Sequence, residues 1–127
     1  MLEIKATRSS PEIMFYREKG ILVIRGESYP ENSFQFFAPV FQWLEKEFRE
    51  LEKLEIHVNI NYMNSSSTKC MLDILDILDE AYSRGADIKI MWFYDSANER
   101  ALDLAEEFRE DLGLDFEIIP RETGRLL

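Results

Sequence analysis

Four consecutive hydroxyl side chains are the groups in this sequence most suited to carry chemistry. They follow an asparagine in the run Asn64-Ser65-Ser66-Ser67-Thr68. Asn, Ser and Thr side chains at a helix start accept hydrogen bonds from unpaired first-turn amides, so one or two of these residues are explained as helix caps. Four hydroxyls exceed what capping needs. A hydroxyl here is also a good phosphate acceptor, because free N–H groups and the positive end of the helix dipole stabilise a dianion.

Residues that usually serve as nucleophiles, bases or metal ligands are scarce. We interpret His57, the one histidine, as a half-exposed strand residue rather than a general base. Cys70, the one cysteine, lies near a predicted helix start that can lower a thiol pKa, but its apolar neighbours favour a role as a small core residue. The sequence contains no Gly-rich phosphate loop, no Gly-x-Ser-x-Gly and no His-Glu-x-x-His. We therefore expect no cofactor, no metal site and no disulfide, and an enzyme is unsupported.

Length and charge narrow the classes of protein further. The chain has 127 residues with 46% hydrophobic content, enough for one domain spanning residues 1–127. Its formal net charge of −10 repels phosphate backbones and anionic lipids, so we expect no nucleic-acid partner and no membrane insertion. The first residues lack the apolar stretch of a secretory signal, which predicts a cytoplasmic protein. A protein-interaction module and a small acidic enzyme remain.

The elements that must position the hydroxyl run are predicted from hydrophobic periodicity. Six segments have the composition or alternation of strands; they are residues 2–6, 13–16, 21–24, 54–61, 88–94 and 116–119. The second and third form a hairpin. Segment 88–94 is nearly all apolar, which predicts a strand inside the sheet with both faces covered.

Three helices are predicted between these strands. The first follows a loop at residues 27–33 and runs to about Leu51; Pro39 either bends it or marks where its regular part begins. The second follows the hydroxyl run and ends near Gly85. The third opens around Asp95 or Ser96 and ends at Gly113. Strands alternating with helices after a hairpin predict an α/β single domain with a mixed sheet.

Three separated motifs resemble the SiaC family of bacterial regulatory phosphoproteins. They are Gly26-Glu27-Ser28-Tyr29-Pro30-Glu31-Asn32-Ser33, then Tyr62-Met63-Asn64-Ser65-Ser66-Ser67-Thr68, and finally Trp92-Phe93-Tyr94-Asp95 with Asn98-Glu99-Arg100. The strand, hydroxyl run and helix also look like the regulatory segment of STAS domains, the anti-sigma-factor antagonists. The resemblance implies a STAS-like fold, with an N-terminal hairpin and about three main helices.

The resemblance also implies a function. It implies a non-catalytic adaptor phosphorylated by a cognate Ser/Thr kinase and restored by a cognate PP2C-type phosphatase. The unphosphorylated form would bind and activate a diguanylate cyclase, raising cyclic di-GMP and promoting biofilm growth. The family's acceptor is a threonine, and Thr68 is the only threonine in this segment. Aligning the STAS pattern would instead select Ser66, with Ser67 and Ser65 as further alternatives.

Residues in the three motifs are candidates for contacting partners. An alternative is that they only shape the starts of helices. The candidates are Tyr29, Pro30, Glu31, Asn32, Asn64, Asp95, Asn98 and Arg100. Two other functions stay open: an antagonist of an anti-sigma factor, and a small acidic enzyme using Cys70 or carboxylates.

Overall fold

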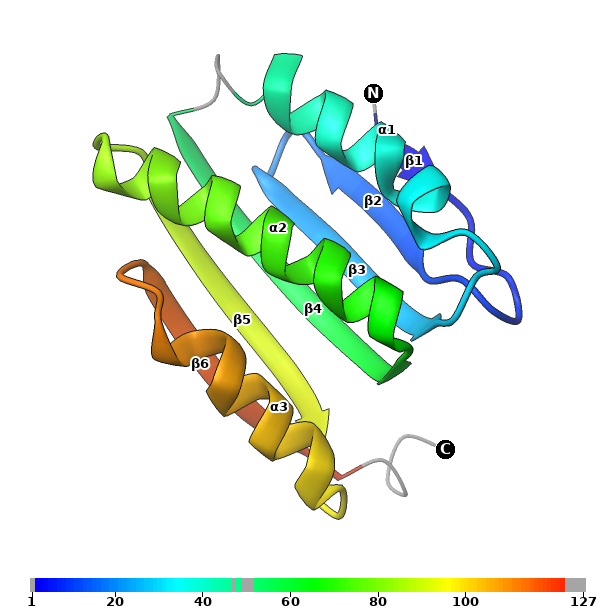
Figure 1. Ribbon diagram of the computed structural model, residues 1–127. Coiled ribbons are helices and arrows are strands. Elements are labelled where there is room, and N and C mark those ends of the chain that lie inside the picture. The colour runs from blue at the N-terminus through cyan, green and yellow to red at the C-terminus, as the bar shows by residue number, and fades with distance from the viewer. Residues whose placement is uncertain (1, 47, 49–51, 123–127) are drawn as a thin grey trace.

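The fold is a six-stranded sheet with three helices packed on it (Figure 1). The computed structural model describes residues 2–46, 48 and 52–122. The strands are β1 (Glu3–Ile4), β2 (Glu12–Tyr16), β3 (Ile21–Ser28), β4 (Lys53–Met63), β5 (Asp87–Asp95) and β6 (Asp115–Arg121). The helices are α1 (Ser33–Lys46), α2 (Ser65–Ser83) and α3 (Glu99–Glu110).

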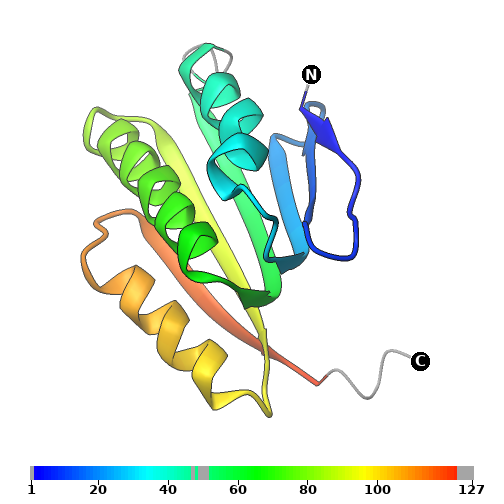
Figure 2. The same ribbon diagram turned by 45° about the vertical axis from the view of Figure 1, so that its right-hand side comes forward.

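The strands lie in the sheet in the order in which they occur in the sequence, β1 to β6. Strands β1, β2 and β3 are antiparallel neighbours, while β3 to β6 are parallel, and each parallel crossover contains one helix. The prediction of an α/β domain with a mixed sheet is confirmed. Right-handed crossovers that all step in one direction place every helix on the same face, as Figures 1 and 2 show.

Strand β5 lies inside the sheet as predicted, but only one of its faces is covered by helices. Ile88, Ile90 and Trp92 are buried against the helices, whereas Met91 and Phe93 on the opposite face are half-buried. The prediction that both faces are covered is therefore wrong. Phe93 is shielded by a neighbouring strand instead, because the guanidinium of Arg121 lies 4.2 Å from the centre of its ring.

Strand β3 extends further than the sequence predicts. The sequence predicts a loop at Glu27 and Ser28, but these residues continue β3 past a register shift between Gly26 and Glu27. Gly26 has a φ of 123°, a conformation that side chains with a Cβ rarely adopt. The bulge thus carries the strand on to Ser28, whose side chain points into the helix-covered side and is fully buried.

The helix boundaries also differ from the predictions. Helix α1 begins at Ser33, so Pro39 lies within it, on the exposed surface, and does not mark its start; the predicted end at Leu51 lies outside the described residues. Helix α3 begins at Glu99 rather than near Asp95 or Ser96, because Asp95 is the last residue of β5. It ends at Glu110, before Gly113.

Candidate functional site

The hydroxyl run lies where the carboxyl ends of β3 and β4 meet the first turns of α1 and α2 (Figure 1). Ser65 is the first residue of α2, so Ser65–Thr68 form its first turn. Ser28 ends β3 and Ser33 begins α1 directly beside this turn, with the segment 29–32 connecting them. The run predicted to precede the helix is thus part of it, and it packs against two further elements.

Asn64 caps α2 and holds this corner of the fold together. Its side-chain Oδ1 accepts hydrogen bonds from the backbone N–H of Ser67 at 2.9 Å and from Ser66 Oγ at 3.2 Å. Its backbone O accepts from both the N–H and the hydroxyl of Thr68, each at 3.0 Å. Its own N–H donates to the backbone O of Ser28 at 2.9 Å. Asn64 therefore joins Thr68, the rest of the first turn and the end of β3.

Four serine hydroxyls from three elements pair with one another behind Asn64. Ser28 Oγ lies 2.7 Å from Ser67 Oγ, Ser67 Oγ lies 3.1 Å from Ser33 Oγ, and Ser33 Oγ lies 2.7 Å from Ser66 Oγ. We call Ser28, Ser67, Ser33 and Ser66 the serine chain. If each hydroxyl donates once, one directed chain runs from Ser28 to Ser66 and ends on Asn64 Oδ1, which satisfies every donor.

The four candidate phosphate acceptors differ in accessibility. Ser67 is fully buried and bonded within the serine chain, so a kinase cannot reach its hydroxyl in the folded protein. Ser66 and Thr68 are half-buried, and Ser65 is exposed. Ser66 is also bonded on two sides, to Ser33 and Asn64. Thr68 has a single hydroxyl hydrogen bond, to its own helix backbone, and is therefore easier to expose than Ser66.

Two other candidate residues, Asn32 and Asn98, cap helices as Asn64 does. Asn32 Oδ1 accepts from Gln35 N at the start of α1, and Asn98 Oδ1 accepts from Ala101 N at the start of α3. The side-chain oxygens of Asn32 and Asn98 therefore shape the starts of helices, which is the alternative that the sequence left open for these residues. Asp95 Oδ1 similarly accepts from Ala97 N in the turn before α3. Arg100 is exposed in the first turn of α3.

Tyr29 lies beside Tyr62, an aromatic residue that is not among the partner-binding candidates predicted from the sequence. Its ring contacts that of Tyr62 edge-on, with centroids 5.9 Å apart, and the two side chains are 39% and 55% exposed. Phe34, one residue after Ser33, and Leu72, one helical turn after Thr68, are also exposed. Pro30 is half-buried and Glu31 exposed between them. Tyr62 follows the alternating run of residues 54–61 and lies near the end of β4, and an exposed aromatic residue there has no distinct sequence pattern.

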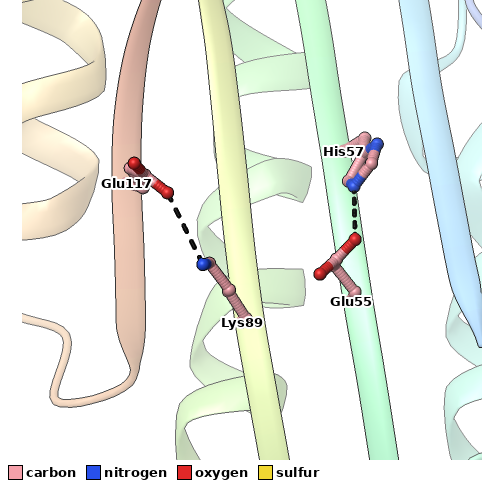
Figure 3. A network of polar contacts seen from close by, with 4 residues as sticks. All are labelled: Glu55, His57, Lys89 and Glu117. Carbon is pink, nitrogen blue, oxygen red and sulfur yellow. Dashed lines mark hydrogen bonds and ion pairs between the residues drawn. The ribbon is translucent and has the colours of Figure 1, made fainter.

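His57 and Cys70, the two side chains considered for catalysis by name, lie on opposite sides of the sheet. His57 lies on the open face of the sheet, where its Nε2 is 2.7 Å from Glu55 Oε2; Figure 3 shows this pair beside the ion pair of Lys89 and Glu117, with the helices behind the sheet. This placement matches the prediction of a half-exposed strand residue. Cys70 is fully buried, and burial raises the pKa of its thiol, with Asp73 adding to the rise and Lys69 opposing it. A neutral, inaccessible thiol is a poor nucleophile.

Two further features bear on ligands. Among the described residues, no group of three or more His, Cys, Asp or Glu side chains is placed to hold a metal ion. A cavity of about 720 Å³ lies at the other ends of α1 and α2, lined by residues such as Leu44, Phe48, Ala81 and Arg84. It is remote from Asn64 and Thr68.

No helix in the described part of the chain is long and apolar enough to cross a membrane.

Comparison with known proteins shows the family to which this chain is similar. The model of the SiaC family regulatory phosphoproteins matches residues 4–121. An uncharacterised protein of Pseudomonas aeruginosa strain UCBPP-PA14 is 43% identical over 118 residues, which are 92% of this chain and 94% of that protein.

Two solved structures from Pseudomonas aeruginosa have the same fold. One is the crystal structure of the diguanylate cyclase SiaD in complex with its activator SiaC, with a TM-score of 0.91, 42% identity and coverage of 95% of this chain and 100% of that chain. The other is apo-SiaC, with a TM-score of 0.87, 41% identity and coverage of 93% and 97%. Asn64 and Thr68 lie within the residues 4–121 that the family model matches.

Proposed function

Because this chain belongs to the SiaC family of regulatory phosphoproteins, we propose that it activates a diguanylate cyclase and that phosphorylation of Thr68 switches the activation off. One observation carries the first part: a SiaC that is 42% identical over 95% of this chain is the activator in a crystallised complex with the cyclase SiaD. The protein regulates a partner enzyme and has no catalytic activity of its own. Its output is a rise in cyclic di-GMP, which promotes biofilm growth.

Thr68 is the acceptor that we propose. Ser67 is buried and Ser66 is bonded on two sides, whereas Ser65 is exposed. We prefer Thr68 to Ser65 because the resemblance to the SiaC family implies a threonine acceptor. Thr68 is half-buried and needs to break only one side-chain hydrogen bond, the one to Asn64 O, to reach a kinase. A Ser/Thr kinase adds the phosphate and a PP2C-type phosphatase removes it, both in the cytoplasm.

The surface around Thr68 is suited to a protein partner. Tyr29 and Tyr62 present exposed aromatic rings, and Leu72 lies on α2 four residues after Thr68. Exposed aromatic and apolar side chains gathered at one end of a small acidic protein are typical of an interface. We propose that Pro30, Glu31, Asp95 and Arg100 lie at its rim.

A phosphate at Thr68 would oppose docking on this surface. It adds nearly two negative charges and three strongly hydrated oxygens, which an apolar interface would have to desolvate. A coupling of about 1–3 kcal/mol between modification and binding corresponds to about a 5- to 150-fold loss of affinity, which is enough for a switch.

The test measures cyclic di-GMP synthesis by the diguanylate cyclase from the same bacterium, with and without this protein. The native protein and Thr68→Ala should stimulate synthesis and bind the cyclase alike. Thr68→Asp and protein phosphorylated at Thr68 should bind at least 5-fold more weakly. Ser83→Asp, at the exposed far end of α2, is the matched control for added charge and should bind normally.

Each part of the proposal has its own contradicting result. If no stimulation occurs with any form, the cyclase is not the target. If stimulation occurs but Thr68→Asp and Ser83→Asp bind equally well, Thr68 is not the switch. Peptide mapping after treatment with the kinase and ATP then identifies which of Ser65, Ser66 and Thr68 carries the phosphate.

A further inference from the structure

The serine chain connects the proposed switch to the proposed docking surface. We propose that Ser33 is a positioning residue that transmits the state of Thr68, through Asn64, to the segment 29–32 that carries Tyr29. This inference rests on the proposed function, because it takes Thr68 as the modified residue. The inference goes beyond the proposed function because it assigns a role to a buried serine that contacts neither the phosphate nor the partner.

The contacts of Asn64 provide the first step. Thr68 binds the backbone O of Asn64, and the serine chain ends on the side-chain Oδ1 of the same residue. A change at Thr68 that moves Asn64 therefore changes the acceptor on which the serine chain ends. Ser33 Oγ also lies 3.5 Å from Asn64 Oδ1. Helix α1 therefore contacts the cap of α2 through Ser33.

Modification of Thr68 would disturb Asn64 in two ways. Transfer of the γ-phosphoryl group of ATP to Thr68 Oγ1 forms an O–P bond and releases ADP and the hydroxyl proton. The ester oxygen then has no proton to donate to Asn64 O. The dianion also competes for the first-turn N–H groups, including that of Ser67, which Asn64 Oδ1 now holds. Both effects loosen Asn64 from its present position.

The serine chain holds both ends of the segment 29–32. Ser28 precedes this segment, with its hydroxyl on Ser67 and its backbone O on Asn64 N. Ser33 follows it, with its hydroxyl between Ser67 and Ser66. A rearrangement of the serine chain would therefore move both anchors of these four residues, while the N–H of Tyr29 stays on Ser9 O. Tyr29, whose ring is exposed against Tyr62, is therefore positioned by buried hydroxyls.

Burial makes this arrangement sensitive to a single change. The described residues include four buried polar side chains, and Ser28, Ser33 and Ser67 are three of them, each no more than 1% exposed. A hydroxyl enclosed in this way has no water to replace a lost partner. Moving Asn64 therefore forces the serine chain into a second set of hydrogen bonds, because its hydroxyls cannot shift gradually without losing their partners. Hydroxyls that served only to fill space would not need to form one connected chain across three elements.

The experiment measures whether Ser33 carries the coupling. Affinity for the cyclase is measured for the native protein, Thr68→Asp, Ser33→Ala and the double variant. We expect Thr68→Asp to weaken binding at least 5-fold in the native background and by less than half that factor when Ser33 is alanine, because the direct cost of desolvating the charge stays while the coupling through Ser33 is lost. Ser33→Cys, which fills the site with a slightly larger side chain and is only a weak hydrogen-bond donor, should behave like Ser33→Ala and serves if the cavity left by alanine destabilises the fold.

Ser10→Ala is the matched control, because Ser10 is the fourth buried polar residue and its hydroxyl pairs with Thr7 Oγ1 at 2.6 Å. It is a stringent control, since the adjacent Ser9 O accepts the N–H of Tyr29. Ser10→Ala should keep the full effect of Thr68→Asp. The inference is overturned if the Ser33 variants keep it as well. If Thr68→Asp has no effect even in the native background, the proposed switch itself fails, and this inference fails with it.

Discussion

Replacing Asn64 with alanine removes the side-chain oxygen at the centre of the corner formed by β3, α1 and α2. The oxygen accepts the N–H of Ser67 and the hydroxyl of Ser66. Asn98 offers a matched comparison, because it caps α3 in the same way and its Oδ1 accepts the N–H of Ala101. The two substitutions remove the same chemical group from the same position of a helix.

The expected costs differ because the surroundings differ. Loss of an N-cap side chain typically lowers the free energy of unfolding by about 1 kcal/mol, which is our expectation for Asn98→Ala, where the half-exposed Ala101 N–H can bind water. Ser67 is fully buried, so its N–H is left without a partner at a further cost of about 1–3 kcal/mol. We expect Asn64→Ala to lower the free energy of unfolding by about 3 kcal/mol in total.

Urea unfolding followed by the fluorescence of Trp43 and Trp92, both buried, measures these free energies. Asn64→Asp keeps the acceptor and adds a charge that the helix N-terminus favours, so it should stay within about 0.5 kcal/mol of the native protein. Equal costs for Asn64→Ala and Asn98→Ala would refute the view that Asn64 does more than cap its helix. So would a cost for Asn64→Asp as large as that for alanine.

Two other expectations follow from buried or strained positions. Burial raises the pKa of the Cys70 thiol, so at pH 8 it should react with Ellman's reagent slowly in the folded protein and at once in urea; equal rates would show that the thiol is accessible. Gly26→Ala places a Cβ 3.4 Å from Pro11 Cα at a φ of 123° and should lower the free energy of unfolding by about 1–2 kcal/mol in urea unfolding. Gly113→Ala, where the Cβ would make an ordinary 3.7 Å contact and φ lies outside the left-handed region, should cost clearly less.

The uncovered face of the sheet shows where pattern reading is limited. An apolar run such as residues 88–94 predicts a strand with two buried faces, because parallel strands usually lie between two layers of helices. Here the strands follow one another in sequence order, so the crossovers place all helices on one side. Phe93 is shielded instead by side chains of the adjacent strands, those of Arg121 and His57. Periodicity within a strand cannot report the direction in which the next crossover turns.

The asparagines before the helices were partly predictable. Asn32, Asn64 and Asn98 each precede a helix, and capping is a local interaction that spans only three residues, so their structural roles follow from sequence position. The boundary of α3 was misplaced because Asp95 and Ser96 offer equally suitable capping side chains nearby. The choice among them depends on where β5 leaves the sheet, since its pairing with β6 continues to Asp95.

The type and order of the strands and helices follow from the amino-acid sequence, since alternation and helical spacing record which side of each element is buried. The location of the hydroxyl run at the start of α2 follows in the same way, because capping residues act within one turn. The serine chain depends on the folded structure. Ser28 and Ser33 lie more than thirty residues from Ser67 in the sequence, and only the meeting of β3, α1 and α2 brings their hydroxyls within hydrogen-bonding distance. No local pattern encodes such a contact, because it is set by how separate elements pack.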